Sequence, residues 1–322
     1  MAKTKKIDTF TAMDHNEAQA ERFARMNGDA RADQFRPVVE AYQFSDGQPA
    51  EARYIREEST GQILNPHIAP TYAFVPYQER WTSFDNILAD SGLDLSNKLV
   101  SYDWSNGGAR AFRQVVLPAY NRTMRDDDTV ALRFLEWDSV DGSSAYLLRA
   151  GFYQWVCANT CTTGDEVFKV YNRHRGRPRK EMTKHDERVM ALKAEEQYEN
   201  MIDMTKNALG EFEVFTDGLK ELATMPVKVE AHTLDFLNNS LAGENSQKAP
   251  VKVRALAEHL HANWAEYRRE HDNTWYDFAA VLTDYAARGA KTEREIDART
   301  RPQREDWAGR AIKALPQFAM AA

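Results

Sequence analysis

Between Ala109 and Val170 the chain carries three segments rich in β-branched and aromatic residues, ARAFRQVVLP, TVALRFLEW and SSAYLLRAGFYQWVC. Each is short enough to form one strand, and polar turns separate them. Asp141-Gly142 lies between two of these apolar runs and is a hairpin signal. We therefore expect an antiparallel sheet that continues through EVFKVYNRH to about Tyr171.

After Pro178 the apolar residues recur at helical spacing instead. One such block runs from Thr183 to Met225, where Gly210 and Gly218 are expected to divide the helix, and another from Val251 to Arg288. Composition predicts a loop at NNSLAGENSQKAP between them. The expected fold class is α+β, with a central antiparallel sheet packed against long C-terminal helices.

The ends of the chain are more polar than its middle. We expect a loosely packed polar arm over residues 1–60, although SFDNILAD further on predicts a helix that begins near Ser83 and stops at Gly92. The main α+β domain is expected over 61–290, with the sheet at about 109–171 and the helical part at about 183–288. Residues 291–322 are expected to form a C-terminal tail.

Composition limits the classes of function. The chain has 322 residues, 43% of them hydrophobic, and a formal net charge of −7. No window is apolar enough to span a bilayer, and no apolar signal region follows the basic start, so we expect a cytoplasmic protein with no membrane partner. The negative charge argues against a protein that coats duplex DNA with its whole surface. Any nucleic-acid contact must come from a local basic patch.

One segment has that character. RHRGRPRK belongs to a run from Lys169 to Lys180 that contains no acidic residue. The tetrad RGRP is similar to the core of an AT-hook, which places arginines in a minor groove. The alternative is an exposed loop whose arginines pair with Glu181 or Asp186. The expected phosphate-binding residues are Lys169, Arg173, Arg175, Arg177, Arg179 and Lys180, with Tyr171 as a stacking platform for a base.

A second candidate surface is the predicted sheet, where arginines and aromatic residues alternate along three strands. In the functional interpretation Arg110, Phe112 and Arg113 contact nucleic acid. In the alternative the aromatic residues are core and the arginines are their solvated neighbours. Exposure of Phe134 and Trp155 distinguishes the two interpretations.

No catalytic or metal-binding motif is present. His259 and His261 are too sparse for a metal site, and Asp126 to Asp128 are typical of a solvated turn. Cys157 and Cys161 are interpreted as reduced thiols, because two cysteines fall short of a structural zinc site. The turn Asp138 to Ser144 is expected to be structural. We therefore expect no cofactor and no metal.

The middle of the chain resembles a family found on phages and plasmids, the domain of unknown function 932. The resemblance covers about residues 63–290 and rests on GARAFRQVVLP, DDTVALRFLEWDSVDGSSAYLLRAGFYQWVCANTC, VYNRH and NTWYDFAAVLTDYA. Its most specific part is Ser139, Asp141, Gly142 and Ser143, followed by Val156, Cys157 and Asn159. The family's usual arginine before the cysteine is replaced here by Gln154 or Trp155, and the resemblance implies no established activity.

The function expected from these features is non-catalytic binding of nucleic acid, with single-stranded DNA as the ligand, in phage or plasmid recombination. By analogy the hairpins on a long helix are similar to phage single-strand-annealing recombinases, which suggests a homo-oligomer. The alternative is a protein-interaction factor that uses its acidic surface against a host protein, such as a host defence complex. A hydrolase with an unrecognised site is a third interpretation.

Overall fold

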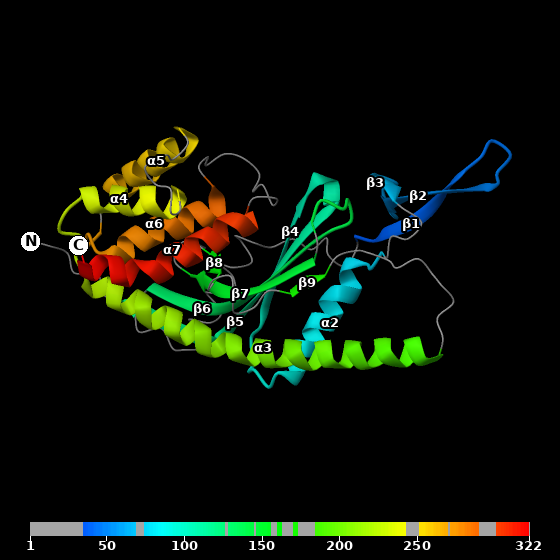
Figure 1. Cartoon of the computed structure of the whole chain (residues 1–322), viewed down its shortest axis with the longest axis horizontal. Helices are drawn as coiled ribbons and strands as arrows, with labels where there is room; N and C mark the ends of the chain where they lie inside the picture. The colour runs from blue at the N-terminus through cyan, green and yellow to red at the C-terminus, as the bar shows by residue number, and fades with distance from the viewer. Residues whose placement is uncertain are drawn as a thin grey trace, which may run out of the picture.

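The computed structural model has an α+β architecture in which an antiparallel sheet is covered by helices (Figure 1). This confirms the predicted fold class. Most of the basic segment and the first 34 residues lie outside the described part of the chain. The structure describes residues 35–68, 74–125, 128–144, 146–155, 160–162, 170–172, 184–242, 251–269, 271–289 and 301–321.

The main sheet has the order β4-β5-β6-β7-β8, and β9 pairs with the other end of β7. All of its pairings are antiparallel, as the alternating apolar pattern predicts. The strands are β4 (Leu99–Ser105), β5 (Arg110–Arg125), β6 (Asp128–Ser139), β7 (Tyr146–Gln154), β8 (Thr160–Thr162) and β9 (Val170–Asn172).

The turn between β6 and β7 is closed by its own small polar side chains. The Ser139 hydroxyl donates to the carbonyl of Ser144 and accepts from its N–H, both at 2.9 Å. The Asp141 carboxylate accepts from the N–H of Ser143 at 2.9 Å, and Gly142 takes the left-handed conformation at φ 72°. These bonds agree with the structural role expected for the turn.

Alternation along the strands gives the main sheet two distinct faces. On the first face Val115, Phe134 and Phe152 belong to the large hydrophobic core. On the second face Gln114 and Arg133 lie beside two smaller apolar clusters, one around Phe112 and the other around Val116. The arginines and aromatic residues of neighbouring strands do share a face, as the pattern predicts.

Helices α2 (Tyr77–Asp90) and α3 (Lys184–Thr224) cover the first face. Phe84 of α2 meets Phe134 edge to face with ring centroids 5.5 Å apart, and Phe215 of α3 lies 5.5 Å from Phe152. α3 runs without interruption through Gly210 and Gly218, so the predicted division of this helix is wrong. α2 begins six residues before Ser83 and ends at Asp90, two residues before Gly92, where φ is 73°.

The remaining helices form a layer at one end of the molecule (Figure 1). They are α4 (Ala231–Ala242), α5 (Val251–Tyr267), α6 (Trp275–Arg288) and α7 (Arg301–Ala321). α4 occupies the first residues of the predicted loop NNSLAGENSQKAP, so that prediction is wrong there. The Thr274 side chain caps α6 and exchanges hydrogen bonds with Asp277. The second predicted helical block is therefore divided into two helices, α5 and α6.

Two terminal regions differ from their sequence-based descriptions. Within the predicted N-terminal arm, β1 (Pro37–Gln43) and β2 (Pro49–Glu57) form an antiparallel pair that β3 (Ile63–Ile68) extends to three strands. Within the predicted tail, α7 buries Ala308, Ile312 and Leu315 in the large core. None of the helices in the described residues is long and apolar enough to cross a membrane.

Candidate functional site

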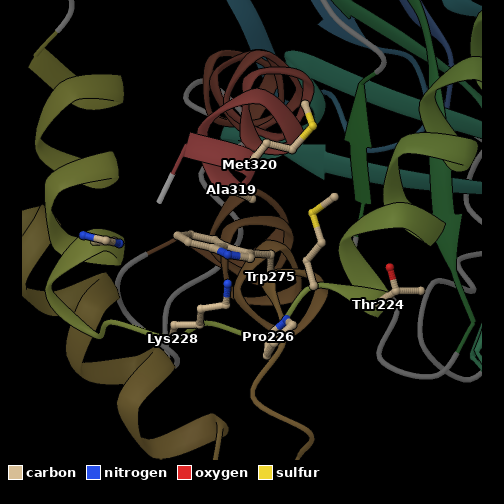
Figure 2. Close-up of a pocket in the computed structure, with 8 residues that line it drawn as sticks. Thr224, Pro226, Lys228, Trp275, Ala319 and Met320 are labelled. Carbon is tan, nitrogen blue, oxygen red and sulfur yellow. The ribbon is translucent and has the colours of Figure 1, made fainter.

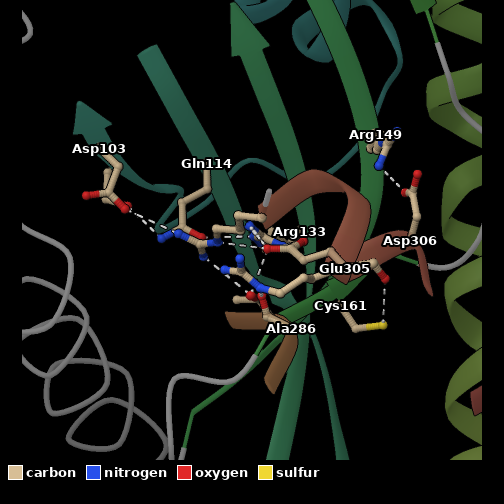
Figure 3. A network of polar contacts seen from close by, with 12 residues as sticks. Asp103, Gln114, Arg133, Arg149, Cys161, Ala286, Glu305 and Asp306 are labelled. Carbon is tan, nitrogen blue, oxygen red and sulfur yellow. Dashed lines mark hydrogen bonds and ion pairs between the residues drawn. The ribbon is translucent and has the colours of Figure 1, made fainter. Parts of the chain in front are cut away.

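The second face of the main sheet carries a network of buried charges (Figure 3). At its centre the Glu305 carboxylate of α7 accepts from both terminal nitrogens of Arg133 on β6, at 2.7 and 3.2 Å. Both side chains are fully buried. Gln114 accepts from Nε of Arg133 at 2.9 Å, so the guanidinium is bound on two sides.

Arg301 joins the same network from the first turn of α7. Its Nε donates to Glu305 at 2.9 Å, and its Nη1 donates at 3.2 Å to Asp103, whose side chain is 48% exposed. Burial alone would raise the pKa of Glu305, but Arg133 and Arg301 outweigh burial and hold that pKa at about 2. Burial lowers the pKa of Arg301 despite its two carboxylate partners.

The charges in this network balance. Two arginines face two carboxylates, and beside them Arg149 of β7 is ion-paired with Asp306 of α7. A balanced, buried network has little attraction left for a phosphate group. Its chemical effect is to fasten the first turn of α7 to the sheet.

Two of the three predicted interface residues of the sheet, Phe112 and Arg113, are buried. Phe112 is 1% exposed, and its ring lies under the guanidinium of Arg301, 4.2 Å from the ring centroid. Arg113 is 2% exposed on the opposite face, where it pairs with Asp85 and Glu136. Neither side chain is open to a nucleic acid in this structure. Arg110 is partly exposed and bound to Asp141 at 3.1 Å.

Phe134 and Trp155, whose exposure distinguishes the two interpretations of the sheet, are 0% and 4% exposed. The aromatic residues of the sheet are therefore core, as the alternative interpretation states. The arginines differ from that interpretation, because Arg113 and Arg133 are buried with carboxylate partners instead of being solvated. For Arg133 the reason is α7, whose acidic residues cover the second face of the sheet, and for Arg113 it is α2, whose Asp85 pairs with it on the first face.

The first face holds a second buried carboxylate. Glu136 of β6 accepts from Arg113 Nη1 at 2.6 Å and from the Tyr146 hydroxyl at 2.7 Å. Burial raises the pKa of Glu136 to about 7, although Arg113 and Tyr146 act in the opposite direction. Burial would lower the pKa of Arg113, but Glu136 and Asp85 together raise it. Both pKa values are raised, because two carboxylates outweigh burial at Arg113 whereas a single arginine does not outweigh burial at Glu136.

Most of the predicted basic segment cannot be placed. Lys169 and Arg173, Arg175, Arg177, Arg179 and Lys180 lie outside the described residues, as do Asp126, Asp127 and Cys157. Tyr171 is part of β9, where its backbone pairs with Leu147 of β7. The segment therefore connects a strand of the main sheet to the first residue of α3, between a strand and a helix as predicted.

The other candidate groups do not converge on one site. Asp128 is buried and accepts from Gln154 and from the Tyr276 hydroxyl. His261 contacts the Thr233 hydroxyl at 2.9 Å, and His259 contacts the side chain of Asn263 at 3.3 Å. Cys161 is a buried thiol that donates to the carbonyl of Glu305 at 3.5 Å. Among the described residues no group of three or more histidine, cysteine or carboxylate side chains is arranged to hold a metal ion.

A family model described as Domain of unknown function (DUF932) matches residues 67–314, well over half of the chain. The chain belongs to the DUF932 family. The DUF932 match extends from the end of β3 into α7, so it includes the helix that carries Glu305 and Asp306. Comparison with curated proteins and with solved structures gave no match.

Sequence reasoning missed Arg301, Glu305 and Asp306 because charged residues in a polar stretch are typical of solvated tails. A signal was present. Ala308, Ala311, Ile312 and Leu315 follow one another at spacings of three, one and three residues, which is the pattern of a helix with one buried face.

Proposed function

We propose that the protein binds single-stranded nucleic acid, without a chemical step, through phosphate contacts made by the basic segment of residues 169–180. The observation that carries this proposal is charge. Within these twelve residues six are lysine or arginine and none is acidic, in a chain whose net charge is −7. A local run of this kind attracts phosphates even when the whole protein is acidic.

The arginines of the main sheet are poor candidates for phosphate contacts, which supports assigning these contacts to the basic segment. Arg113, Arg133, Arg149 and Arg110 each pair with a carboxylate of the protein itself. Their positive charge is neutralised within the fold. Attraction to a polyanion has to come from elsewhere, and the segment that follows β9 has the required composition.

Single-stranded nucleic acid is favoured over duplex because an aromatic residue adjoins the basic run. Tyr171 lies two residues before Arg173, and base stacking on an aromatic ring beside basic side chains is a common way to hold a single strand. Duplex binding through the RGRP tetrad would instead depend on a narrow minor groove.

The test is fluorescence-anisotropy titration of labelled single-stranded and duplex DNA at several salt concentrations. The protein is compared with a variant in which Arg175, Arg177 and Arg179 are all changed to Ala. We expect a preference for the single strand, and loss of three phosphate contacts should reduce the slope of log K against log salt by about 2.

A matched control replaces three lysines of the helices, Lys206, Lys220 and Lys313, by Ala, which changes the net charge by the same amount. The control should bind as the unmodified protein does. Equal losses in both variants would mean that only net charge matters, and absence of binding at low salt would overturn the proposal. Preference for A·T-rich duplex would replace it with minor-groove binding.

A further inference from the structure

A pocket of about 230 Å³ lies at the far end of the helical layer, where five elements meet. The end of α3, the loop from α3 to α4, the first turn of α4, the first turn of α6 and the last turn of α7 each contribute to its wall (Figure 2). None of the charged networks described above includes the residues that line it. It is therefore a separate feature of the molecule.

One wall is aromatic and rigidly held. The Trp275 ring meets Phe278 and Phe318 edge to face, with centroids 5.6 and 5.8 Å away. The backbone N–H of Trp275 donates to the carbonyl of Met225 at 2.9 Å, and a β-bridge joins Pro226 to the residue before Trp275. This wall needs no rearrangement before a ligand binds, which reduces the entropic cost of binding.

Two methionines and an alanine complete the apolar lining. Met225 lies on the α3 side, and Ala319 and Met320 lie at the end of α7. Met320 is 69% exposed, an unusual exposure for so large an apolar side chain. Methionine is flexible and polarisable, so these side chains can adapt to a flat apolar group against Trp275.

The charge at the pocket is positive. Lys228 and His232 line it, and none of its eight lining residues is acidic. Figure 2 shows the amino group of Lys228 pointing toward the indole of Trp275. In the part of the chain that the structure describes, no carboxylate pairs with Lys228. The neighbouring Glu230 is instead bound to Arg268 at 2.5 Å.

An apolar floor with a free cation at its edge selects a particular ligand chemistry. The floor favours an aromatic or similarly flat body, and the Lys228 ammonium favours an anionic group on that body. The volume is below the roughly 300 Å³ at which pockets for drug-sized ligands begin. A single ring with one acidic group is therefore the expected size.

We propose that this pocket binds a small aromatic anion, with its ring against Trp275 and the two methionines and its anionic group at Lys228. The site is independent of the proposed nucleic-acid segment. The segment precedes the first residue of α3, whereas the pocket lies at the last turn of this 41-residue helix. At a rise of about 1.5 Å per residue the two ends are roughly 60 Å apart.

The test uses the full-length protein with ¹³C-labelled methionine methyl groups, observed by NMR during titration with phenylacetate. Phenethylamine, which has a similar ring and the opposite charge, is the matched probe. We expect the Met225 and Met320 signals, assigned by single changes to Leu, to shift with phenylacetate and to remain unchanged with phenethylamine.

Two variants locate the site. Lys228→Met should weaken phenylacetate binding at least tenfold, and Lys313→Met, at an exposed lysine of α7, should leave it unchanged. Neither change should alter DNA binding, so the result separates this pocket from the proposed nucleic-acid function. Equal shifts with both probes, unchanged binding in Lys228→Met, or no shift at either methionine would each overturn the proposal.

Discussion

Two buried glutamates lie on opposite faces of the same sheet and have opposite electrostatic behaviour. Glu305 has two arginine partners, and its pKa is held at about 2. Glu136 has one arginine and one tyrosine partner, and burial raises its pKa to about 7. Both are fully buried. The number of cationic partners, and not the depth of burial, decides whether a buried carboxylate stays ionised at neutral pH.

The largest expected effect comes from removing the better-neutralised carboxylate. Glu305→Ala leaves Arg133 and Arg301 buried together without a shared partner, and loss of one member of a buried ion pair costs about 3–5 kcal/mol. We expect the free energy of unfolding, measured by urea denaturation at pH 7, to fall by that amount.

The matched control for this change is Glu211→Ala, which breaks an exposed pair with Lys313 between α3 and α7. Exposed pairs contribute about 0–1 kcal/mol. If Glu305→Ala were as mild as Glu211→Ala, the buried network would not fasten α7 to the sheet, and the contrast between the two glutamates would lose its structural meaning.

The second prediction concerns pH and has opposite signs for the two glutamates. The pKa of Glu136 is raised from 4.5 to about 7 on folding. As pH rises, the unfolded chain therefore loses this proton at a lower pH than the folded protein does. Stability should therefore fall as pH rises from about 4.5 to about 7, by on the order of 3 kcal/mol from this group alone. For Glu305 the contribution is present above about pH 4.5 and is lost as pH falls toward 2.

The measurement is the free energy of unfolding between pH 4.5 and 8 for the unmodified protein and for Glu136→Gln, which keeps the shape of the side chain and removes its titration. The difference between the two curves should change steadily across this range and level off above pH 7. Glu211→Gln serves as the control and should run parallel to the unmodified protein. A constant difference for Glu136→Gln would show that Glu136 is ionised throughout.

The same contrast explains which parts of the fold are readable from sequence. Strands β5, β6 and β7 of the main sheet and the buried face of α3, with Phe212, Phe215 and Leu219, follow local apolar patterns and were predicted, whereas β4 lies before the predicted start of the sheet at about residue 109. The burial of Glu57 in β2 could not be predicted in this way, since this charged side chain is only 3% exposed and accepts hydrogen bonds from Ser59 and Thr60 in the adjoining turn. A buried charge looks like a surface charge in a sequence.

The candidate site was predictable to a smaller extent. Alternation predicted that some aromatic residues and arginines share a face of the sheet, and Phe112 and Arg133 do so. It did not reveal that Glu305, 172 residues further along the chain than Arg133, covers them. Whether a sheet face is open to a ligand depends on long-range packing, and local periodicity contains no information about that packing.

The smallest expected effect tests the aromatic part of the second face. Phe112→Leu keeps an apolar side chain of similar size but removes the ring that faces the guanidinium groups of Arg301 and Arg133, at 4.2 and 5.7 Å. A cation–π contact contributes about 0.5–2 kcal/mol, so we expect a loss of about 1–2 kcal/mol in urea unfolding.

Phe134→Leu is the control on the opposite face, where that ring meets Phe84 edge to face at 5.5 Å. A double-mutant cycle of Phe112→Leu with Arg301→Met should show a coupling of about 1 kcal/mol, which a purely apolar role for Phe112 would not produce. Binding of single-stranded DNA should be the same before and after Phe112→Leu, because the ring is 1% exposed. A fall in DNA affinity with the fold intact would mean that α7 leaves the sheet when nucleic acid binds, and that the buried charges of this face then belong to the interface.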